Sequence, residues 1–180
     1  AESAKPVTYA ELMARMTGAE DKLAVTRARL APLFASETEY EAFRARHARA
    51  AVARQELAAY QGKAWLGIDC GSTTTKLTLI GEDKSILYSY YSANRGDPVS
   101  LVREQLRQLY ALCGERVQIV GSAATGYGEE LIRHAFHVDS GVVETIAHYT
   151  AARYFRPEVD FILDIGGQDI KCFHIKDGLI

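Results

Sequence analysis

The sequence lacks any apolar run that approaches the roughly 20 residues of a membrane-spanning helix. Its N-terminus is polar, so no secretory signal peptide is visible. Cysteine is scarce: Cys70, Cys113 and Cys172 lie far apart and form no Cys-x-x-Cys pair. A zinc or iron–sulfur site built from this chain alone is therefore not expected. An odd number of thiols without a secretion signal indicates reduced cysteines in a cytoplasm.

Neither sign of charge dominates, because 21 basic residues oppose 23 acidic ones. No part of the chain has the basic excess of a nucleic-acid-binding surface. Apolar residues make up 48% of the chain, which indicates a globular protein rather than a disordered one. The 180 residues suffice for one domain or for part of a larger two-lobed protein. Since the first residue is Ala and the last two are Leu179 and Ile180, we expect a fragment of a longer polypeptide.

Glycine is almost absent from residues 1–63, which are rich in Ala, Arg and Glu. Thr8 with Glu11, and Ser36 with Glu39, match the capping-box pattern that begins a helix.

The second of these helices is expected to run through Tyr40 to Ala51, with Leu57 and Tyr60 after it. Its apolar stripe is thin. We interpret residues 1–63 as a helical linker or packing arm, with a partner-binding helix as the alternative, and place the boundary at Gly62–Lys63.

From Ala64 onward the pattern changes to short alternating runs separated by tight turns, which predict an antiparallel meander followed by alternating helices and strands. The expected strands are 65–68, 76–80, 86–91 and 117–122, and the expected helices begin after Asp97, after the glycine-rich loop 125–128 and at Ser140. The last helix is expected to turn Val143, Ala147, Ala151 and Tyr154 inward. Strands at 161–164 and 170–175, with a hairpin turn at 176–178, then begin a second meander. The predicted order is βββαβαα at 64–157, followed by the first strands of a second, truncated lobe at 158–180.

Two stretches in this pattern repeat each other, Leu66–Lys76 and Phe161–Lys171. In each, an apparently buried strand ends in an aspartate (Asp69 or Asp164), and a glycine follows two residues later. One such turn is explained by the ordinary preference of Asp and Gly for tight turns. Two copies at matching places in two meanders favour a shared site, because a duplicated lobe would place the acidic turns face to face.

The chemistry of these turns suits a magnesium-bound phosphate. Gly71 lets the backbone approach an anion closely, and the hydroxyls of residues 72–75 with Lys76 add donors and positive charge. Asp69 and Asp164 can hold Mg²⁺ or a magnesium-bound water.

Gln168 and Asp169 can orient a water for attack on a γ-phosphate. The spacing is not that of a P-loop, and no βαβ unit surrounds the first turn as a dinucleotide fingerprint requires.

The strings DxGSxxTK and DxGGQD resemble the phosphate-1 and phosphate-2 motifs of the actin, hexokinase and Hsp70 superfamily. The longer strings GIDCGSTTTK, ATGYG and DIGGQDIK resemble more narrowly the activators of 2-hydroxyacyl-CoA dehydratases and the related ATPase subunits of benzoyl-CoA reductase, often termed BcrAD/BadFG-like. The resemblance covers about residues 64–180, and its three motifs occur in family order. The run Tyr40–Tyr60 resembles the join between two activase-like modules in very large members.

This resemblance implies a ribonuclease-H-like α/β fold and a cytoplasmic ATPase that binds ATP and Mg²⁺. Family members dimerise around a shared iron–sulfur cluster and use ATP hydrolysis to drive a low-potential electron into a CoA-ester dehydratase or reductase. By position, Asp69 and Asp164 would serve Mg²⁺, with Gln168 and Asp169 as the further catalytic residues. The phosphate-binding positions would be Gly71, Ser72, Thr73, Thr74, Lys76, Gly166 and Gly167.

The family's cluster cysteines follow the second phosphate motif, and none of the three cysteines matches them. The iron–sulfur ligands are therefore expected outside this chain, with pairing of activase modules as a dimer or within a longer protein. A small-molecule kinase of sugar-kinase type and a non-catalytic, nucleotide-gated interaction domain are the alternatives. Glu144 and His148, four residues apart on one helix face, are interpreted as a satisfied, partly buried pair, with a link between the lobes or a contact to a cluster region as the alternative.

Overall fold

The computed structural model describes residues 6–26 and 31–180, and the chain forms two compact units, residues 1–51 and 52–180. The first unit contains α1 (Tyr9–Thr26) and α2 (Glu37–Ala48). The predicted capping box at the start of α1 is confirmed. The Thr8 N–H donates to Glu11 Oε2 at 2.9 Å, and the Glu11 N–H donates to Thr8 Oγ1 at 3.3 Å.

Helix α2 begins as predicted, because the Glu39 N–H donates to Ser36 Oγ at 3.2 Å. Its predicted extension to Ala51 is wrong, since the helix ends at Ala48. Residues 53–55, which belong to the second unit, pair with Ile86 of that unit. The Ile86 N–H donates to the Ala53 carbonyl at 2.8 Å, and the Gln55 N–H donates to the Ile86 carbonyl at 3.1 Å.

Residues 52–61 belong to the second unit. Leu57 is buried in its core, and the Arg116 guanidinium donates to the backbone carbonyls of this segment, at 2.7 Å in the case of Ala58. The division between the units therefore precedes the boundary expected at Gly62–Lys63.

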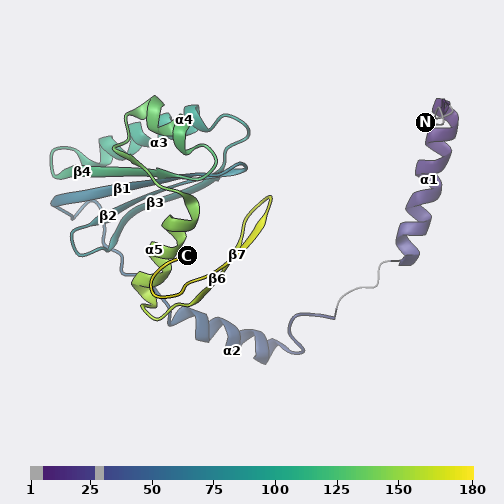
Figure 1. The fold of residues 1–180 in the computed structure, drawn as a ribbon, viewed down its shortest axis with the longest axis horizontal. Coiled ribbons are helices and arrows are strands. Elements are labelled where there is room, and N and C mark those ends of the chain that lie inside the picture. Colours follow the sequence, from purple (N-terminus) through teal and green to yellow (C-terminus); the bar gives the residue numbers. More distant parts are fainter. Residues whose placement is uncertain (1–5, 27–30) are drawn as a thin grey trace. The chain divides into compact units, whose positions relative to one another are not determined.

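The second unit is built on a five-stranded sheet with the order β3-β2-β1-β4-β5 (Figure 1). Its strands are β1 (Gly62–Cys70), β2 (Thr74–Gly81), β3 (Ile86–Ala93), β4 (Val117–Thr125) and β5 (Ser140–Gly141). The antiparallel meander of β1, β2 and β3 is confirmed, and β4 runs parallel to β1.

Two helices, α3 (Pro98–Cys113) and α4 (Glu129–Phe136), lie on one face of this sheet (Figure 1). The alternation of β1 turns Ala64, Leu66, Ile68 and Cys70 toward the helices, where they join a buried cluster with Val102, Leu109 and Ile132. Asp97 caps α3 as predicted, accepting from the Ser100 N–H at 3.0 Å. The core therefore lies between the sheet and these two helices.

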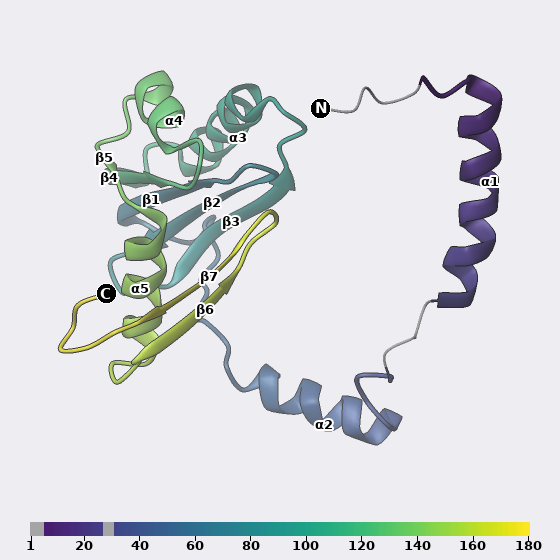
Figure 2. The ribbon, with the colours of Figure 1, turned by 45° about the vertical axis from the view of Figure 1, so that its right-hand side comes forward.

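Helix α5 (Glu144–Phe155) lies on the other side of the sheet, beside a separate two-stranded hairpin (Figure 2). The prediction that Ser140 caps this helix is wrong. Ser140 lies in β5, where its register partner is Ala123 of β4, and the helix begins four residues later. The predicted inward stripe is also wrong, because Val143 and Tyr154 are 69% and 54% exposed.

The hairpin consists of β6 (Phe161–Ile165) and β7 (Ile170–His174), paired antiparallel. The interpretation of 161–164 as a buried strand is wrong, since Phe161 and Leu163 are 45% and 57% exposed. Only alternate residues of the hairpin are partly buried, because no element in the described part of the chain covers its other face. The predicted turn after β7 is confirmed. Lys176 and Leu179 exchange two hydrogen bonds of 2.9 Å around Asp177 and Gly178, which both have positive φ.

None of the helices in residues 6–26 and 31–180 combines the length and the apolar character needed to cross a lipid bilayer.

Candidate functional site

The first turn joins β1 to β2 at the end of the sheet and is closed by a short hydrogen bond. The Gly71 N–H donates to the Thr74 carbonyl at 2.9 Å, and Ser72 and Thr73 lie exposed at the tip between them. Such an exposed backbone loop can place N–H groups and hydroxyls around an anion.

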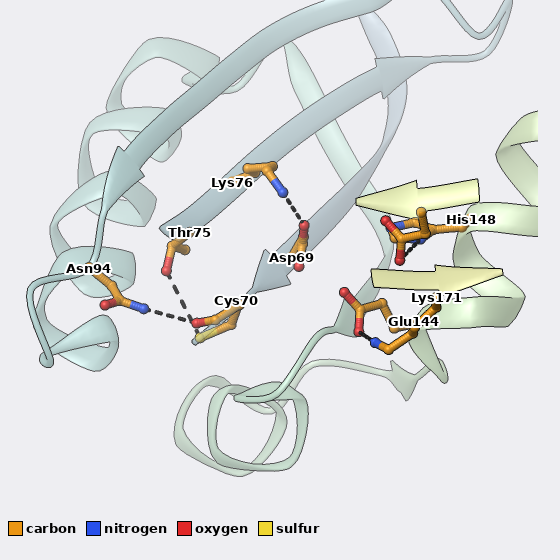
Figure 3. A network of polar contacts seen from close by, with 10 residues as sticks. Asp69, Cys70, Thr75, Lys76, Asn94, Glu144, His148 and Lys171 are labelled. Carbon is orange, nitrogen blue, oxygen red and sulfur yellow. Dashed lines mark hydrogen bonds and ion pairs between the residues drawn. The ribbon is translucent and has the colours of Figure 1, made fainter. Parts of the chain in front are cut away.

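A buried amide holds this turn in place from the end of β3. Asn94 is 6% exposed, and its Nδ2 donates to the Gly71 carbonyl at 2.9 Å while its backbone N–H donates to the Thr73 carbonyl at 3.0 Å (Figure 3). Its Oδ1 in turn accepts from the Gly96 N–H at 3.2 Å. Sequence reasoning missed Asn94, because nothing local distinguishes it from an ordinary turn residue.

Asp69 and Lys76 face each other across the β1–β2 ladder, with Lys76 Nζ 2.6 Å from Asp69 Oδ2 (Figure 3). The other carboxylate oxygen, Oδ1, is buried and has no hydrogen-bond partner in the described residues. A buried acceptor without a donor costs free energy unless a cation or water satisfies it. The geometry therefore leaves one buried oxygen of Asp69 without a hydrogen-bond partner among the described residues.

The glycine-rich loop after β4 packs directly beneath Asp69. A Cβ atom on Gly126 would lie 2.7 Å from Asp69 Oδ1 and 2.6 Å from the Cys70 carbonyl oxygen, and its φ is +87°. The Gly128 N–H donates to the same Cys70 carbonyl at 2.8 Å. Only glycine fits at Gly126, so the loop and the carboxylate form one close-packed assembly.

Cys70 and Thr75 point to the opposite face, toward the core, and both are at most 1% exposed. Burial is the main cause that raises the pKa of the Cys70 thiol. The interpretation of Cys70 as a core residue is thus confirmed, and the buried Thr75 hydroxyl is turned away from the exposed tip of the turn.

The second turn repeats the geometry of the first. The Gly166 N–H donates to the Asp169 carbonyl at 2.9 Å, and Asp164 pairs with Lys171 in the β6–β7 register as Asp69 pairs with Lys76. The residues predicted from this motif, Gly166, Gly167, Gln168 and Asp169, are all exposed.

The tips of the two turns lie against each other. A Cβ atom on Gly167 would lie 2.7 Å from Thr73 Oγ1, so the backbone of the second turn touches the side chain of the first. This approach places Gly167 of the second motif beside the hydroxyl of Thr73 in the first.

Helix α5 supplies two side chains that sequence analysis treated as structural. His148 Nδ1 lies 3.1 Å from Asp164 Oδ2, and Glu144 Oε2 lies 2.8 Å from Lys171 Nζ (Figure 3). The hydrogen bond to Glu144 is the main cause that raises the pKa of Lys171 to about 12, so this lysine is positively charged at neutral pH. The spacing of Glu144 and His148, four residues apart and shortly before the second motif, was the sequence signal that could have placed them at this site.

A cavity of about 290 Å³ opens beside the first turn. Its walls come from β1, β2 and β4, with Val142 and Ala147 on the α5 side, and Asp69 and Lys76 supply its charged groups. This volume is at the lower end of ligand pockets.

The residues present fit a magnesium ion. Mg²⁺ prefers carboxylate oxygens and waters, and Asp69 Oδ1 is a buried carboxylate oxygen that lacks a protein donor in the described residues. Asp164 would contribute the second carboxylate from the facing turn.

Comparison with known proteins shows the family of this chain. Residues 66–179, more than half of the chain, match the BadF/BadG/BcrA/BcrD ATPase family. An uncharacterized protein of Methanocaldococcus jannaschii, MJ0004, is 37% identical over 118 residues, which are 64% of this chain and 45% of that protein. The (R)-2-hydroxyglutaryl-CoA dehydratase activating ATPase of Acidaminococcus fermentans is 29% identical over 116 residues, which are 63% of this chain and 43% of that protein.

Two solved structures share the fold. The crystal structure of component A of the Acidaminococcus fermentans dehydratase has a TM-score of 0.55 and 27% identity, and the match covers 66% of this chain and 45% of that one. The activator of 2-hydroxyisocaproyl-CoA dehydratase from Clostridium difficile, solved with bound ADPNP, has a TM-score of 0.50 and 28% identity over 63% of this chain and 41% of that one. The predicted α/β fold of actin/hexokinase type is confirmed. The chain spans less than half the length of these relatives.

Proposed function

Because the chain belongs to the BadF/BadG/BcrA/BcrD ATPase family, we propose that it is the ATP-binding part of an ATP-dependent redox activator. The observation that carries this proposal is the pair of matching acidic turns, closed by the same hydrogen bond and in contact at Thr73 and Gly167. Relatives of this chain are named as activators of CoA-ester dehydratases.

The first turn would bind the phosphates of ATP through Gly71, Ser72, Thr73, Thr74 and Lys76. Asn94 fixes the backbone of this turn, so its N–H groups need no rearrangement to meet an anion. Lys76, whose ammonium lies 2.6 Å from Asp69 Oδ2, would also supply positive charge to the phosphate oxygens. Asp69 and Asp164 would hold this Mg²⁺, which supplies neutralisation of the phosphate charge.

The second turn would hold the γ-phosphate from the facing side. Gly166 and Gly167 allow a close approach of the backbone, and Gln168 and Asp169 would orient the attacking water. Asp169 Oδ2 lies 3.4 Å from Lys171 Nζ, which limits the freedom of that carboxylate.

The two turns account for nucleotide binding only, and electron transfer would require further groups and a partner protein. We propose that ATP hydrolysis drives a low-potential electron into a CoA-ester dehydratase or reductase in the cytoplasm. The iron–sulfur cluster that carries the electron would be held outside this chain, between paired activase modules, because Cys70 and Cys113 are buried in the core and Cys172 stands alone on β7.

The site is tested by calorimetric titration of ADPNP into the protein at several Mg²⁺ concentrations. Asp69→Asn and Asp164→Asn should each weaken the magnesium-dependent part of nucleotide binding by about tenfold or more, because loss of groups around a metal costs at least this much. Asp177→Asn in the turn after β7 is the matched control, since Asn also accepts its positive φ. Binding that is equally strong in all three variants would overturn the assignment.

A further inference from the structure

Two parallel contacts connect α5 to the β6–β7 hairpin. Glu144 and His148 lie one helical turn apart on α5, and Lys171 and Asp164 lie directly opposite each other on the two strands. Glu144 reaches Lys171 at 2.8 Å and His148 reaches Asp164 at 3.1 Å (Figure 3). The helix therefore contacts Asp164, one of the two carboxylates that the proposed function assigns to magnesium.

The contact of His148 resembles the one that Lys76 makes in the first turn. Lys76 engages Oδ2 of Asp69 and leaves Oδ1 free, and His148 Nδ1 engages Oδ2 of Asp164. Asp164 is 17% exposed and His148 is 35% exposed, so both side chains have limited freedom to turn toward water. An imidazole that donates from Nδ1 fixes the plane of the carboxylate it contacts.

These side chains could instead be a metal site of their own, because donor atoms of Glu144, His148 and Asp164 lie within 4.8 Å of one another. The ammonium of Lys171 occupies the Glu144 carboxylate and would have to leave before a dication could bind there. A magnesium ion also prefers oxygen ligands to imidazole. The contacts thus favour a supporting role for His148.

We propose that His148 is a positioning residue for Asp164: its Nδ1, 3.1 Å from Oδ2, would hold in place the carboxylate that is proposed to bind the magnesium of bound ATP. This inference rests on the proposed function. Groups that support a metal-binding carboxylate in this way change metal affinity by about 10- to 100-fold when they are lost. The helix would then contribute to magnesium binding without touching the ion.

The test compares ADPNP binding across a magnesium titration in three variants. His148→Leu should raise the Mg²⁺ concentration for half-maximal binding about tenfold, with little change in affinity at saturating Mg²⁺. His148→Asn, whose amide nitrogen stands where Nδ1 stood, should restore most of the loss. Glu144→Ala is the matched control, because it breaks the neighbouring contact of the same helix with the same hairpin and should leave the magnesium dependence unchanged.

A second readout needs no nucleotide. Nitrogen-15 NMR of labelled histidine should show a proton on Nδ1 of His148, and Asp164→Ala should shift that signal. An unprotonated Nδ1 would overturn the inference. An equal rise in the Mg²⁺ concentration for half-maximal ADPNP binding in His148→Leu and Glu144→Ala would also overturn it. Stoichiometric Zn²⁺ binding to the nucleotide-free protein that disappears in His148→Leu would also overturn it in favour of a metal site.

The two proposals fail differently. If the wild-type protein binds no ADPNP at any Mg²⁺ concentration, the proposed function fails and the inference fails with it. If it binds ADPNP and His148→Leu leaves the magnesium dependence unchanged, the inference alone fails.

Discussion

At the scale of single residues, the first turn depends on Asn94, whose amide and backbone fasten the turn through the carbonyls of Gly71 and Thr73. Asn94→Ala would leave the partly buried carbonyl of Gly71 without this donor, which costs about 1–3 kcal/mol of unfolding free energy. Urea unfolding of the two proteins measures the difference. Ser92→Ala on the same strand is the control and should stay within about 0.5 kcal/mol of the wild type, and an equal loss in both variants would contradict the assignment.

The glycine-rich loop offers a second test at this scale, because Gly126 and Gly96 both have positive φ but different surroundings. A Cβ on Gly96 meets nothing within 4 Å, so Gly96→Ala should cost only the backbone strain of about 1–2 kcal/mol. Gly126→Ala adds an overlap with Asp69 and Cys70, which should cost about 1–3 kcal/mol more. Urea unfolding compares the pair, and equal costs would show that the loop does not pack against Asp69 as described.

At the scale of elements, the N-cap of α3, Asp97, is expected to make the stability of the protein depend on pH. The hydrogen bonds that Asp97 accepts from Ser100 are the main cause that lowers the pKa of Asp97 below its ordinary value of 3.8. The ionised carboxylate therefore favours the folded state above pH 3.8, and this contribution is lost as the pH falls through the lowered pKa.

We expect Asp97→Asn to keep the cap and to lose its titration. The stability difference between the wild type and this variant should shrink as the pH falls below 3.8, measured as urea midpoints across a pH series. A difference that stays constant across the series would contradict this role of Asp97.

Helix α5 shows how an element can be predicted correctly while its packing is not. Its existence followed from the helical spacing, but the residues expected to face inward are largely exposed. The side chains that connect α5 to the β6–β7 hairpin are Glu144 and His148, which contact residues that follow the helix in the chain. Helical spacing identifies a face, and only the neighbouring element decides what that face contacts.

At the scale of the whole molecule, the hairpin leaves apolar side chains exposed on one face. Phe161, Leu163, Ile165 and Ile170 are 45%, 57%, 68% and 69% exposed. A contiguous apolar surface of this kind binds hydrophobic dyes.

We expect the protein to enhance the fluorescence of 8-anilinonaphthalene-1-sulfonate, and the double variant Ile165→Thr, Ile170→Thr to reduce it. Threonine keeps the strand propensity and removes apolar surface. Leu33→Thr, which removes an 85% exposed apolar residue from the other unit, is the control. Equal fluorescence in the wild type and the double variant would show that the dye binds elsewhere.

The sequence by itself determined the local features of this protein. Strand alternation, the caps at Thr8, Ser36 and Asp97 and the two acidic turns depend on residues within a few positions of one another, so their patterns predicted them. Only the tertiary structure decided that Asn94 holds the first turn, that Gly126 lies beneath Asp69 and that His148 reaches Asp164. Each of these contacts joins residues that are 16 or more positions apart, and no local pattern specifies which distant backbone or side chain a residue will contact.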